Sequence, residues 1–249
     1  MRTERNSRTL ALALLCTVLP ALSGTVPGRT LHVDDDATPP GDGFSWTTAF
    51  RSSLCRRLMA MLAIHARYRG REVRRAQLVR RSAEALSTLD GVGEFEILGV
   101  EDICAVVDSP ESLCDTVMAL LSDGSWAIGL GISPDTTDED EARATATGAL
   151  KGSARAGVVK VAYAPRRNAP IAGDIAAAFA LLGHVLGKRT LEGREATSLV
   201  RSGLNQNEAA EELGISKQAM SQRLQAAGWQ AETAGWQLAV NLLARADAA

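Results

Sequence analysis

The strongest constraint on this chain is a stretch near its C-terminus, residues 205–225, with the sequence NQNEAAEELGISKQAMSQRLQ. The side chain of Asn205 can cap a first helix, and Glu208 can reach back to it in a capping box. Gly214 stands where a tight turn between two helices favours a residue that adopts positive φ. Ser216 is then placed to cap a second helix. The spacing therefore predicts a helix-turn-helix.

The second helix of this motif would turn Met220 and Leu224 toward the core, because the two residues are four positions apart. Its outward side chains suit the major groove of double-stranded DNA, where Arg pairs with guanine and Gln with adenine. The predicted DNA-binding residues are Ser216, Lys217, Gln218, Ser221, Gln222 and Arg223. The alternative is an ordinary helical hairpin with a capped, polar surface.

These side chains divide into two roles. We expect Arg223, Gln218 and Gln222 to contact bases. The residues expected to hold the helix on phosphates are Lys217, Ser216 and Ser221. However, residues 188–249 carry seven Lys or Arg and seven Asp or Glu, so this segment is neutral. One copy should bind DNA weakly, and we expect a homodimer, or basic residues elsewhere, to add phosphate contacts.

A basic segment does precede it, because residues 51–81 contain ten arginines and a single acid, Glu72. These arginines can contact phosphates. The alternative, which we favour from the sequence, is the solvated face of a helix over residues 72–86, since no aromatic residues interleave with the charges. The side chains that this helix would bury are Val73, Leu78, Val79, Ala83 and Leu86.

Composition limits the class of protein. The chain has 249 residues, 46% of them hydrophobic, and a formal net charge of −2, which fits one or two globular domains. Its four cysteines form no CxxC pair, and its three histidines are isolated from them. We therefore expect no zinc site, no disulfide framework and no cofactor.

The N-terminus resembles a secretory signal peptide over residues 1–24. A cationic start precedes an apolar run, residues 10–22, and small residues, Ala21 and Ser23, lie before a cleavage point ahead of Gly24. The run is too short for a transmembrane span, so no membrane contact is expected in the mature form. The alternative is a buried N-terminal helix, which the cationic flank disfavours.

A second resemblance covers the next segment, residues 25–53, which contains RTLHVDDDATPPGDGFSWTTAF. This stretch resembles the opening of secreted right-handed β-helix repeat proteins, in which dozens of repeated short strands follow. No such repeats follow here. The segment would therefore have lost the solenoid that it caps.

The apolar patterns after residue 54 predict an α+β domain. Strands are expected at residues 59–68, 94–108, 126–133 and 158–163, and helices at residues 72–89 and 109–123. An acidic loop is expected at Asp135, Asp138, Glu139, Asp140 and Glu141. Helices should cover one face of a small antiparallel or mixed sheet, ferredoxin-like in outline. The predicted fold class is thus α+β, a small ferredoxin-like sheet domain (54–168) followed by an all-α helix-turn-helix domain (169–249).

Between the two predicted domains, residues 164–170 have the composition of a linker. Residues 174–186 then predict an apolar helix that packs on the sheet domain or on a second subunit. Trp229 and Trp236 recur seven residues apart, and apolar residues after them share their face. We interpret both tryptophans as core or dimer anchors rather than as base-stacking residues.

Residues 73–249 resemble the SatD-like proteins of actinobacteria that carry a C-terminal helix-turn-helix. The matching stretches are LVRRSAEAL, FEILGVEDICAVV, LLSDGSWAIGLGI and GLNQNEAAEELGISKQAMSQRLQAAGW. The resemblance implies a cytoplasmic DNA-binding protein with a regulatory role. The chain departs from the family where a Gly-Asp-Glu triplet is usual, because Val100, Glu101 and Asp102 stand there.

In related sheet folds, acids at such a strand end can hold a divalent metal. Glu101 and Asp102 are adjacent, so on a strand they face opposite sides and cannot chelate one ion without a bulge. No histidine, lysine or nucleophile is placed nearby by the sequence. We therefore expect no metal site and no enzymatic activity, while metal binding by these two acids remains the enzymatic alternative.

The two ends of the chain imply different compartments, since a signal peptide exports a protein and a promoter-binding domain stays with DNA. We expect a cytoplasmic protein whose functional body begins near Leu54, with residues 1–53 derived from a fused or misassembled reading frame. The rival hypothesis is a truncated, secreted β-helix-type surface protein with a non-catalytic interaction domain.

Overall fold

A computed structural model describes residues 60–134, 136–151, 154–164 and 169–247 of the chain. The signal-like segment (1–24) and the β-helix-like segment (25–53) lie outside the described residues. So do Cys16, Cys55 and the first arginines of the basic segment. The first described element is therefore the strand predicted for residues 59–68, which spans Met61–Tyr68.

In the part of the chain that the structure describes, five strands form one mixed sheet, which confirms the α+β class. They are β1 (Met61–Tyr68), β2 (Glu96–Ile97), β3 (Asp102–Val107), β4 (Trp126–Ser133) and β5 (Val159–Tyr163). Their order is β2-β3-β1-β4-β5. Strand β1 is antiparallel to both of its neighbours, and Ile64 at its centre lies opposite Ala105 and Leu130. Strand β5 runs parallel to β4 at one edge.

Helices make up most of the remaining described chain. They are α3 (Arg75–Leu86), α4 (Pro110–Asp123), α5 (Glu139–Ala149), α6 (Ala169–Gly187), α7 (Leu191–Arg201), α8 (Gln206–Glu212), α9 (Lys217–Ala226) and α10 (Trp229–Asp247). The caps match the sequence at several ends. Ser109 accepts a hydrogen bond from the Ser112 amide at the start of α4, and Gly124 ends that helix in the left-handed conformation.

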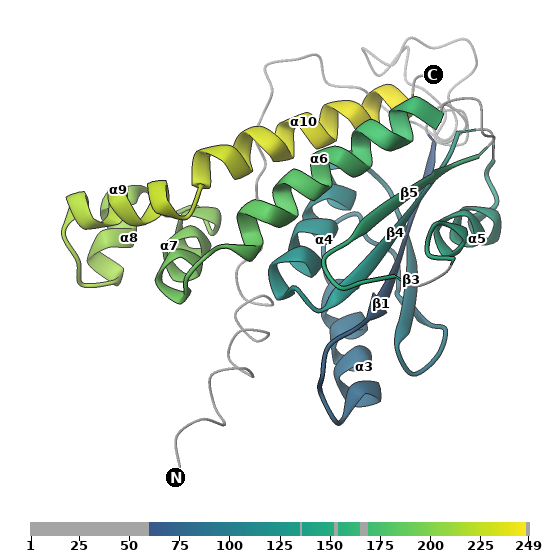
Figure 1. Cartoon of the computed structure of the whole chain (residues 1–249), viewed down its shortest axis with the longest axis horizontal. Coiled ribbons are helices and arrows are strands. Elements are labelled where there is room, and N and C mark those ends of the chain that lie inside the picture. The colour runs from purple at the N-terminus through teal and green to yellow at the C-terminus, as the bar shows by residue number, and fades with distance from the viewer. Residues whose placement is uncertain (1–59, 135, 152–153, 165–168, 248–249) are drawn as a thin grey trace, which may run out of the picture.

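The two faces of the sheet differ in what covers them. One face, which carries Leu62, Ile64 and Ile128, joins α3, α4, α6 and α10 in the main apolar core. The opposite face carries Ala63, which packs against Ala142 and Ala146 of α5. Figure 1 shows α5 on the side of the sheet away from α6 and α10. The expectation of helices on one face only is therefore wrong.

The acidic segment predicted as a loop also differs from expectation, because it starts a helix. The Asp138 carboxylate accepts a hydrogen bond from the Asp140 amide at 2.9 Å and caps α5. The acids of the first turn, Glu139, Asp140 and Glu141, lie where negative charge is favoured by the helix macrodipole. Asp135 lies outside the described residues. The acidic loop expected here is thus, from Asp138 onward, the capped start of α5.

Close packing of α5 depends on glycines in β4. A Cβ built on Gly131 would lie 2.6 Å from the Ala146 nitrogen, and one on Gly129 would lie 2.5 Å from the Ala146 oxygen. Small residues on both surfaces therefore bring the helix backbone close to the strand. Because alanine and glycine carry little hydrophobic signal, the periodicity of α5 was weak in the sequence.

Helices α6 and α10 lie side by side and run in opposite directions (Figure 1). Phe179 and Leu182 of α6 and Leu243 of α10 belong to the same apolar core as the sheet. Helices α6 and α10, which follow the predicted domain boundary between residues 168 and 169, therefore pack in the same core as the sheet domain. Within the described chain, residues 170–187 of α6 are long and apolar enough to span a membrane, a test that a core helix also passes.

The helix at the basic segment is shorter than predicted, beginning at Arg75 rather than at Glu72. Val79, Ala83 and Leu86 are buried as expected. Val73, however, is 93% exposed, so its predicted burial is wrong. The physical reason is that Val73 precedes the helix and does not share the helical period that turns the other apolar residues inward.

Candidate nucleic-acid interface

The turn between α8 and α9 has the geometry that its residues predict. Asn205 Oδ1 accepts hydrogen bonds from the Asn207 and Glu208 amides at 2.9 and 3.1 Å, and the Asn205 amide donates to Glu208 Oε2 at 2.8 Å. This is the predicted capping box. Gly214 follows α8 with a φ of 63°. Its amide donates to the Glu211 carbonyl, and the next amide donates to the Ala210 carbonyl, which closes the helix end.

The start of α9 is fixed by Ser216, whose Oγ accepts a hydrogen bond from the Ala219 amide at 3.2 Å. Met220 and Leu224 are buried, as the four-residue spacing predicts. They meet Ala196 of α7 and Ala209 of α8 in an apolar cluster separate from the core of the sheet. We call α7, α8 and α9 (residues 191–226) the helical module. The module holds α9 by one side only.

The other side of α9 faces solvent. Lys217, Gln218, Ser221 and Gln222 are all exposed, and the structure describes no side-chain hydrogen bond or ion pair for any of them. Figure 1 shows α8 and α9 at the end of the molecule farthest from the sheet, beyond the ends of α6 and α10. A surface placed in this way is accessible to a large partner.

Two of the predicted site residues have additional constraints. The hydroxyl of Ser216 is used as the helix cap, so it is less available for a phosphate. Arg223 is half-buried. The pKa of Glu192, in α7, lies below its usual range, because its carboxylate accepts hydrogen bonds from the Glu192 backbone amide and from Thr190. Attraction to Arg223 acts in the same direction. Arg223 is therefore attracted electrostatically to an acid of α7, although the two side chains form no ion pair.

Acids also dominate the neighbouring helix. Residues 205–226 contain two cations, Lys217 and Arg223, and three acids, Glu208, Glu211 and Glu212. All three acids are exposed, although Glu208 takes part in the capping box. The charge around the exposed side of α9 therefore supplies little attraction for a phosphate backbone.

A buried ionic network attaches the helical module to α10. Glu232 of α10 forms ion pairs with Arg189 and Arg201, and its side chain is only 5% exposed. Arg189 Nε also donates to the Ala227 carbonyl at 2.8 Å. The Arg201 guanidinium carbon lies 5.9 Å from the centre of the Trp229 ring, within the range of a cation–π contact. Arg189 is therefore buried in this network, and Arg201, although 29% exposed, has its charge paired with Glu232.

Trp229 and Trp236 both pack against apolar clusters, as expected for core anchors. Trp229 packs against the cluster of the helical module. Trp236 packs against the main core and donates a hydrogen bond from Nε1 to Asp115 Oδ1 of α4 at 2.8 Å. Burial raises the pKa of Asp115, while the bond from Trp236 acts in the opposite direction. Neither ring is therefore free to stack on a base.

The acids at the start of β3 are held by arginines. Glu101 accepts from Arg69 at 3.1 Å and from Arg75 at 2.5 Å. Asp102 Oδ1 lies 2.5 Å from Arg67 Nε and 2.8 Å from His65 Nε2. The two carboxylates thus have different partners, as expected from adjacent residues on a strand. Among the described residues, no group of three or more His, Cys, Asp or Glu is placed to hold a metal ion.

A cluster of polar residues, partly buried, lies between β1, β3 and α5. His65 is 2% exposed, and its Nδ1 lies 2.9 Å from the Thr147 hydroxyl. Burial acts to raise the pKa of Asp102, but the hydrogen bonds from His65 and Arg67 outweigh it and hold this pKa below its usual range. Burial raises the pKa of the Cys104 thiol to about 11. A thiol with such a pKa is not a nucleophile near neutral pH.

The sequence did not identify the partners of these charged groups. Arg189, Arg201 and Glu232 are separated by up to 43 positions, and His65 is 82 positions from Thr147. Helix α7, which completes the helical module, was not predicted either, although Thr190 at its cap was a usable signal. Comparison of the chain with family models, curated proteins and solved structures gave no match.

Proposed function

We propose that the chain binds double-stranded DNA in a sequence-specific manner, with α9 as the helix that enters the major groove. The observation that carries this proposal is the two-sided character of α9. Met220 and Leu224 hold one side in an apolar cluster, while Lys217, Gln218 and Gln222 are exposed and unpartnered among the described residues. Polar side chains on a fixed, exposed helix can form the hydrogen bonds to base edges that specify a sequence.

The resemblance to SatD-like proteins supports a regulatory role for this DNA binding, in the cytoplasm. The order of the strands supports the ferredoxin-like outline proposed for the sheet. Strands β4, β1, β3 and β2 are adjacent in that order and antiparallel, and α3 and α4 follow β1 and β3 in the chain. We propose that this sheet domain supplies the regulatory input and that the helical module contacts the operator.

We further propose that the active species is a homodimer. The cations of α8 and α9 are limited to Lys217 and Arg223, and Arg189 and Arg201 are occupied by Glu232. One module therefore makes few phosphate contacts. Two copies on neighbouring half-sites would double these contacts and would select a site with two-fold symmetry.

The test is selection of bound duplexes from a random DNA pool by the full chain, residues 1–249, beside the Lys217→Ala, Arg223→Ala double variant. We expect enrichment of a short two-fold-symmetric sequence that the double variant does not enrich. Arg223→Ala alone should weaken binding to the selected site by about 1 to 3 kcal/mol and relax the preference at one base pair.

The matched control is the Lys151→Ala, Arg155→Ala double variant. Both residues are exposed, lie outside the helical module, and have no ion pair to a described residue. Because each double variant removes one lysine and one arginine, the change in net charge is the same. This variant should enrich the same sequence as the unmodified chain. If the unmodified chain enriches no sequence, α9 does not have the proposed role.

A further inference from the structure

A second charged surface lies on the sheet domain, in α3 and the loop before it. Four arginines there, Arg71, Arg74, Arg80 and Arg81, are exposed and have no ion pair or hydrogen bond from the guanidinium to any described residue. We call these four residues the arginine surface. Its neighbours Arg69 and Arg75 differ, because both pair with Glu101. The acids nearest in the sequence are Glu72 and Glu84.

The two arginines at the start of this surface, Arg71 and Arg74, do not stabilise the N-terminal end of α3. Its N-cap residue is Arg74, which forms no side-chain capping bond, and the first turn contains no acid. Positive charge at the N-terminus of a helix opposes the macrodipole. Elsewhere in the described chain, arginines with a structural role form ion pairs, as Arg67 and Arg189 do. Arg71 and Arg74 are thus unpaired cations at an unfavourable helix end, and Arg80 and Arg81 are unpaired cations farther along the same helix, an arrangement that suits an external anion.

The chemistry of the surface favours the phosphate backbone of a duplex over other polyanions. Exposed guanidinium groups spread over a loop and a helix match repeated phosphates better than one small anion. Binding of single-stranded nucleic acid would require exposed aromatic rings for base stacking. The aromatic residues packed near α3, Tyr68 and Phe95, are buried. The surface therefore offers charge without a stacking platform.

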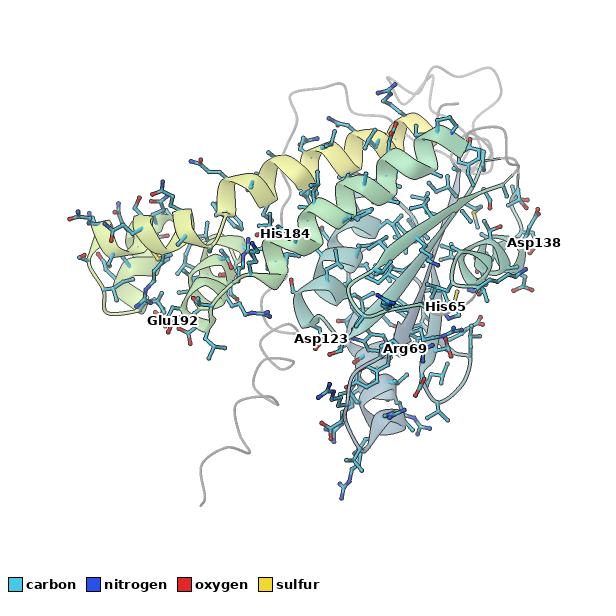
Figure 2. The ribbon with its side chains drawn as sticks, in the orientation of Figure 1. His65, Arg69, Asp123, Asp138, His184 and Glu192 are labelled. Atoms are coloured by element: carbon cyan, nitrogen blue, oxygen red, sulfur yellow. The ribbon has the colours of Figure 1, made fainter. Side chains whose placement is uncertain are left out.

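We propose that the arginine surface binds the phosphates of double-stranded DNA independently of sequence, and so supplies affinity that the helical module lacks. The identity of the polyanion as duplex DNA rests on the proposed function. Figure 2 shows Arg69, beside this surface, at the sheet end of the molecule, and Glu192 at the end formed by the helical module. The two surfaces would therefore contact different segments of DNA.

The test measures the affinity of the full chain for random-sequence and selected duplexes over a series of KCl concentrations. The Arg80→Ala, Arg81→Ala double variant should weaken binding to both duplexes equally. It should also reduce the slope of log affinity against log salt by about 1.8, at about 0.9 for each phosphate contact removed. The Lys151→Ala, Arg155→Ala variant, with the same change in net charge, should retain the original slope.

A third variant tests the same surface through a gain of binding. Glu84 is exposed on α3, four residues after Arg80 and three after Arg81, so it lies on the same side of the helix as both arginines. It has no ion pair to a described residue. Glu84→Gln should therefore strengthen binding to every duplex at low salt, which a loss of folding cannot imitate. If this variant and the Arg80→Ala, Arg81→Ala variant both bind as the unmodified chain does, the arginine surface does not contact DNA.

The outcomes for the two proposals are distinguishable. A sequence preference that depends on Lys217 and Arg223, together with a salt slope unaffected by the arginine surface, would overturn the present inference alone. Equal binding to all duplexes with a slope that depends on Arg80 and Arg81 would support it and overturn sequence-specific binding by α9. Absence of salt-dependent binding by the unmodified chain would overturn both.

Discussion

At the scale of single residues, Glu232 connects the helical module to the long helix α10. Because Arg189 and Glu232 are almost fully buried, removing the acid leaves a guanidinium without its counter-charge. We expect Glu232→Ala to lower the free energy of unfolding by roughly 3 to 5 kcal/mol, measured by urea denaturation. Glu195→Ala removes an exposed acid of α7 and should change stability by less than about 0.5 kcal/mol. Equal effects of the two variants would contradict a structural role for the network.

Asp115 provides a residue-scale prediction about pH. Its folded pKa is raised by burial, so the folded state binds the proton more tightly than the unfolded state does. Its contribution to stability is therefore fully present below the unfolded pKa of about 3.9 and is lost as pH rises through the folded pKa. Asp115→Asn keeps an acceptor for Trp236 and removes this dependence. Stability above the folded pKa should then equal or exceed that of the unmodified chain.

The control for this prediction is Asp115→Ala, which leaves the Trp236 N–H without its acceptor. We expect this variant to lose about 1 to 3 kcal/mol relative to Asp115→Asn. The measurement is the free energy of unfolding of both variants and of the unmodified chain as a function of pH. A steeper pH dependence in Asp115→Asn than in the unmodified chain would show that burial does not control this carboxyl group.

At the scale of elements, the junction of α8 and α9 depends on the conformation of Gly214. Its φ of 63° is unfavourable for residues with a Cβ. Gly214→Ala should therefore cost about 1 to 2 kcal/mol of stability and should weaken DNA binding because the orientation of α9 changes. Gly173→Ala is the control, since a Cβ there meets nothing within 4 Å in a regular helix. This control should be stabilised by roughly 0.5 to 1 kcal/mol, and a loss of equal size in both variants would contradict the turn argument.

The elements also differ in how well the sequence predicted them. The second helix of the motif, the strand at residues 126–133 and the helix that starts at Pro110 all follow local signals, such as capping residues and a short continuous apolar run. The expected acidic loop is the start of helix α5, whose packing surface consists of alanines that meet glycines of β4 and so gives no strong apolar period. That contact is visible only when the helix and the strand are brought together.

At the scale of the whole molecule, the main core and the cluster of the helical module differ greatly in extent. The sheet and α4, α6 and α10 share one large core, whereas the helical module has a small cluster of its own. We expect amides of β1 and β4, at the centre of the sheet, to exchange hydrogen only through global unfolding. Amides of α8 and α9 should exchange through local opening of lower free energy, measured by native-state hydrogen exchange.

The Glu232→Ala variant refines this whole-molecule prediction. Under conditions in which this variant remains folded, the gap between the two sets of amides should widen, because the network joins the helical module to α10. Arg194 provides a second link, since its guanidinium donates to the Ser122 carbonyl of α4 at 2.6 Å. Identical protection of α9 and β1 in the unmodified chain would show instead that the molecule opens as a single unit.

The sequence by itself determined the local features of this protein. Asn205, Gly214 and Ser216 specify the ends of their helices through bonds to neighbouring amides, and the spacing of Met220 and Leu224 specifies the buried side of α9. The same reasoning placed the candidate DNA-contacting residues away from that side, where all but the half-buried Arg223 are exposed. Such features follow from the sequence because the interacting groups lie within a few residues of one another.

Only the tertiary structure decided how the charges are used. It joined Arg189 and Arg201 to Glu232, and arginines of β1 and α3 to the acids Glu101 and Asp102. It also left the arginine surface without ion pairs to the described residues. Pairing between distant residues depends on the order of the strands and on the direction of α10, which no local pattern encodes. The physical reason is that the energy of an ion pair depends on distance in space and on burial, not on separation along the chain.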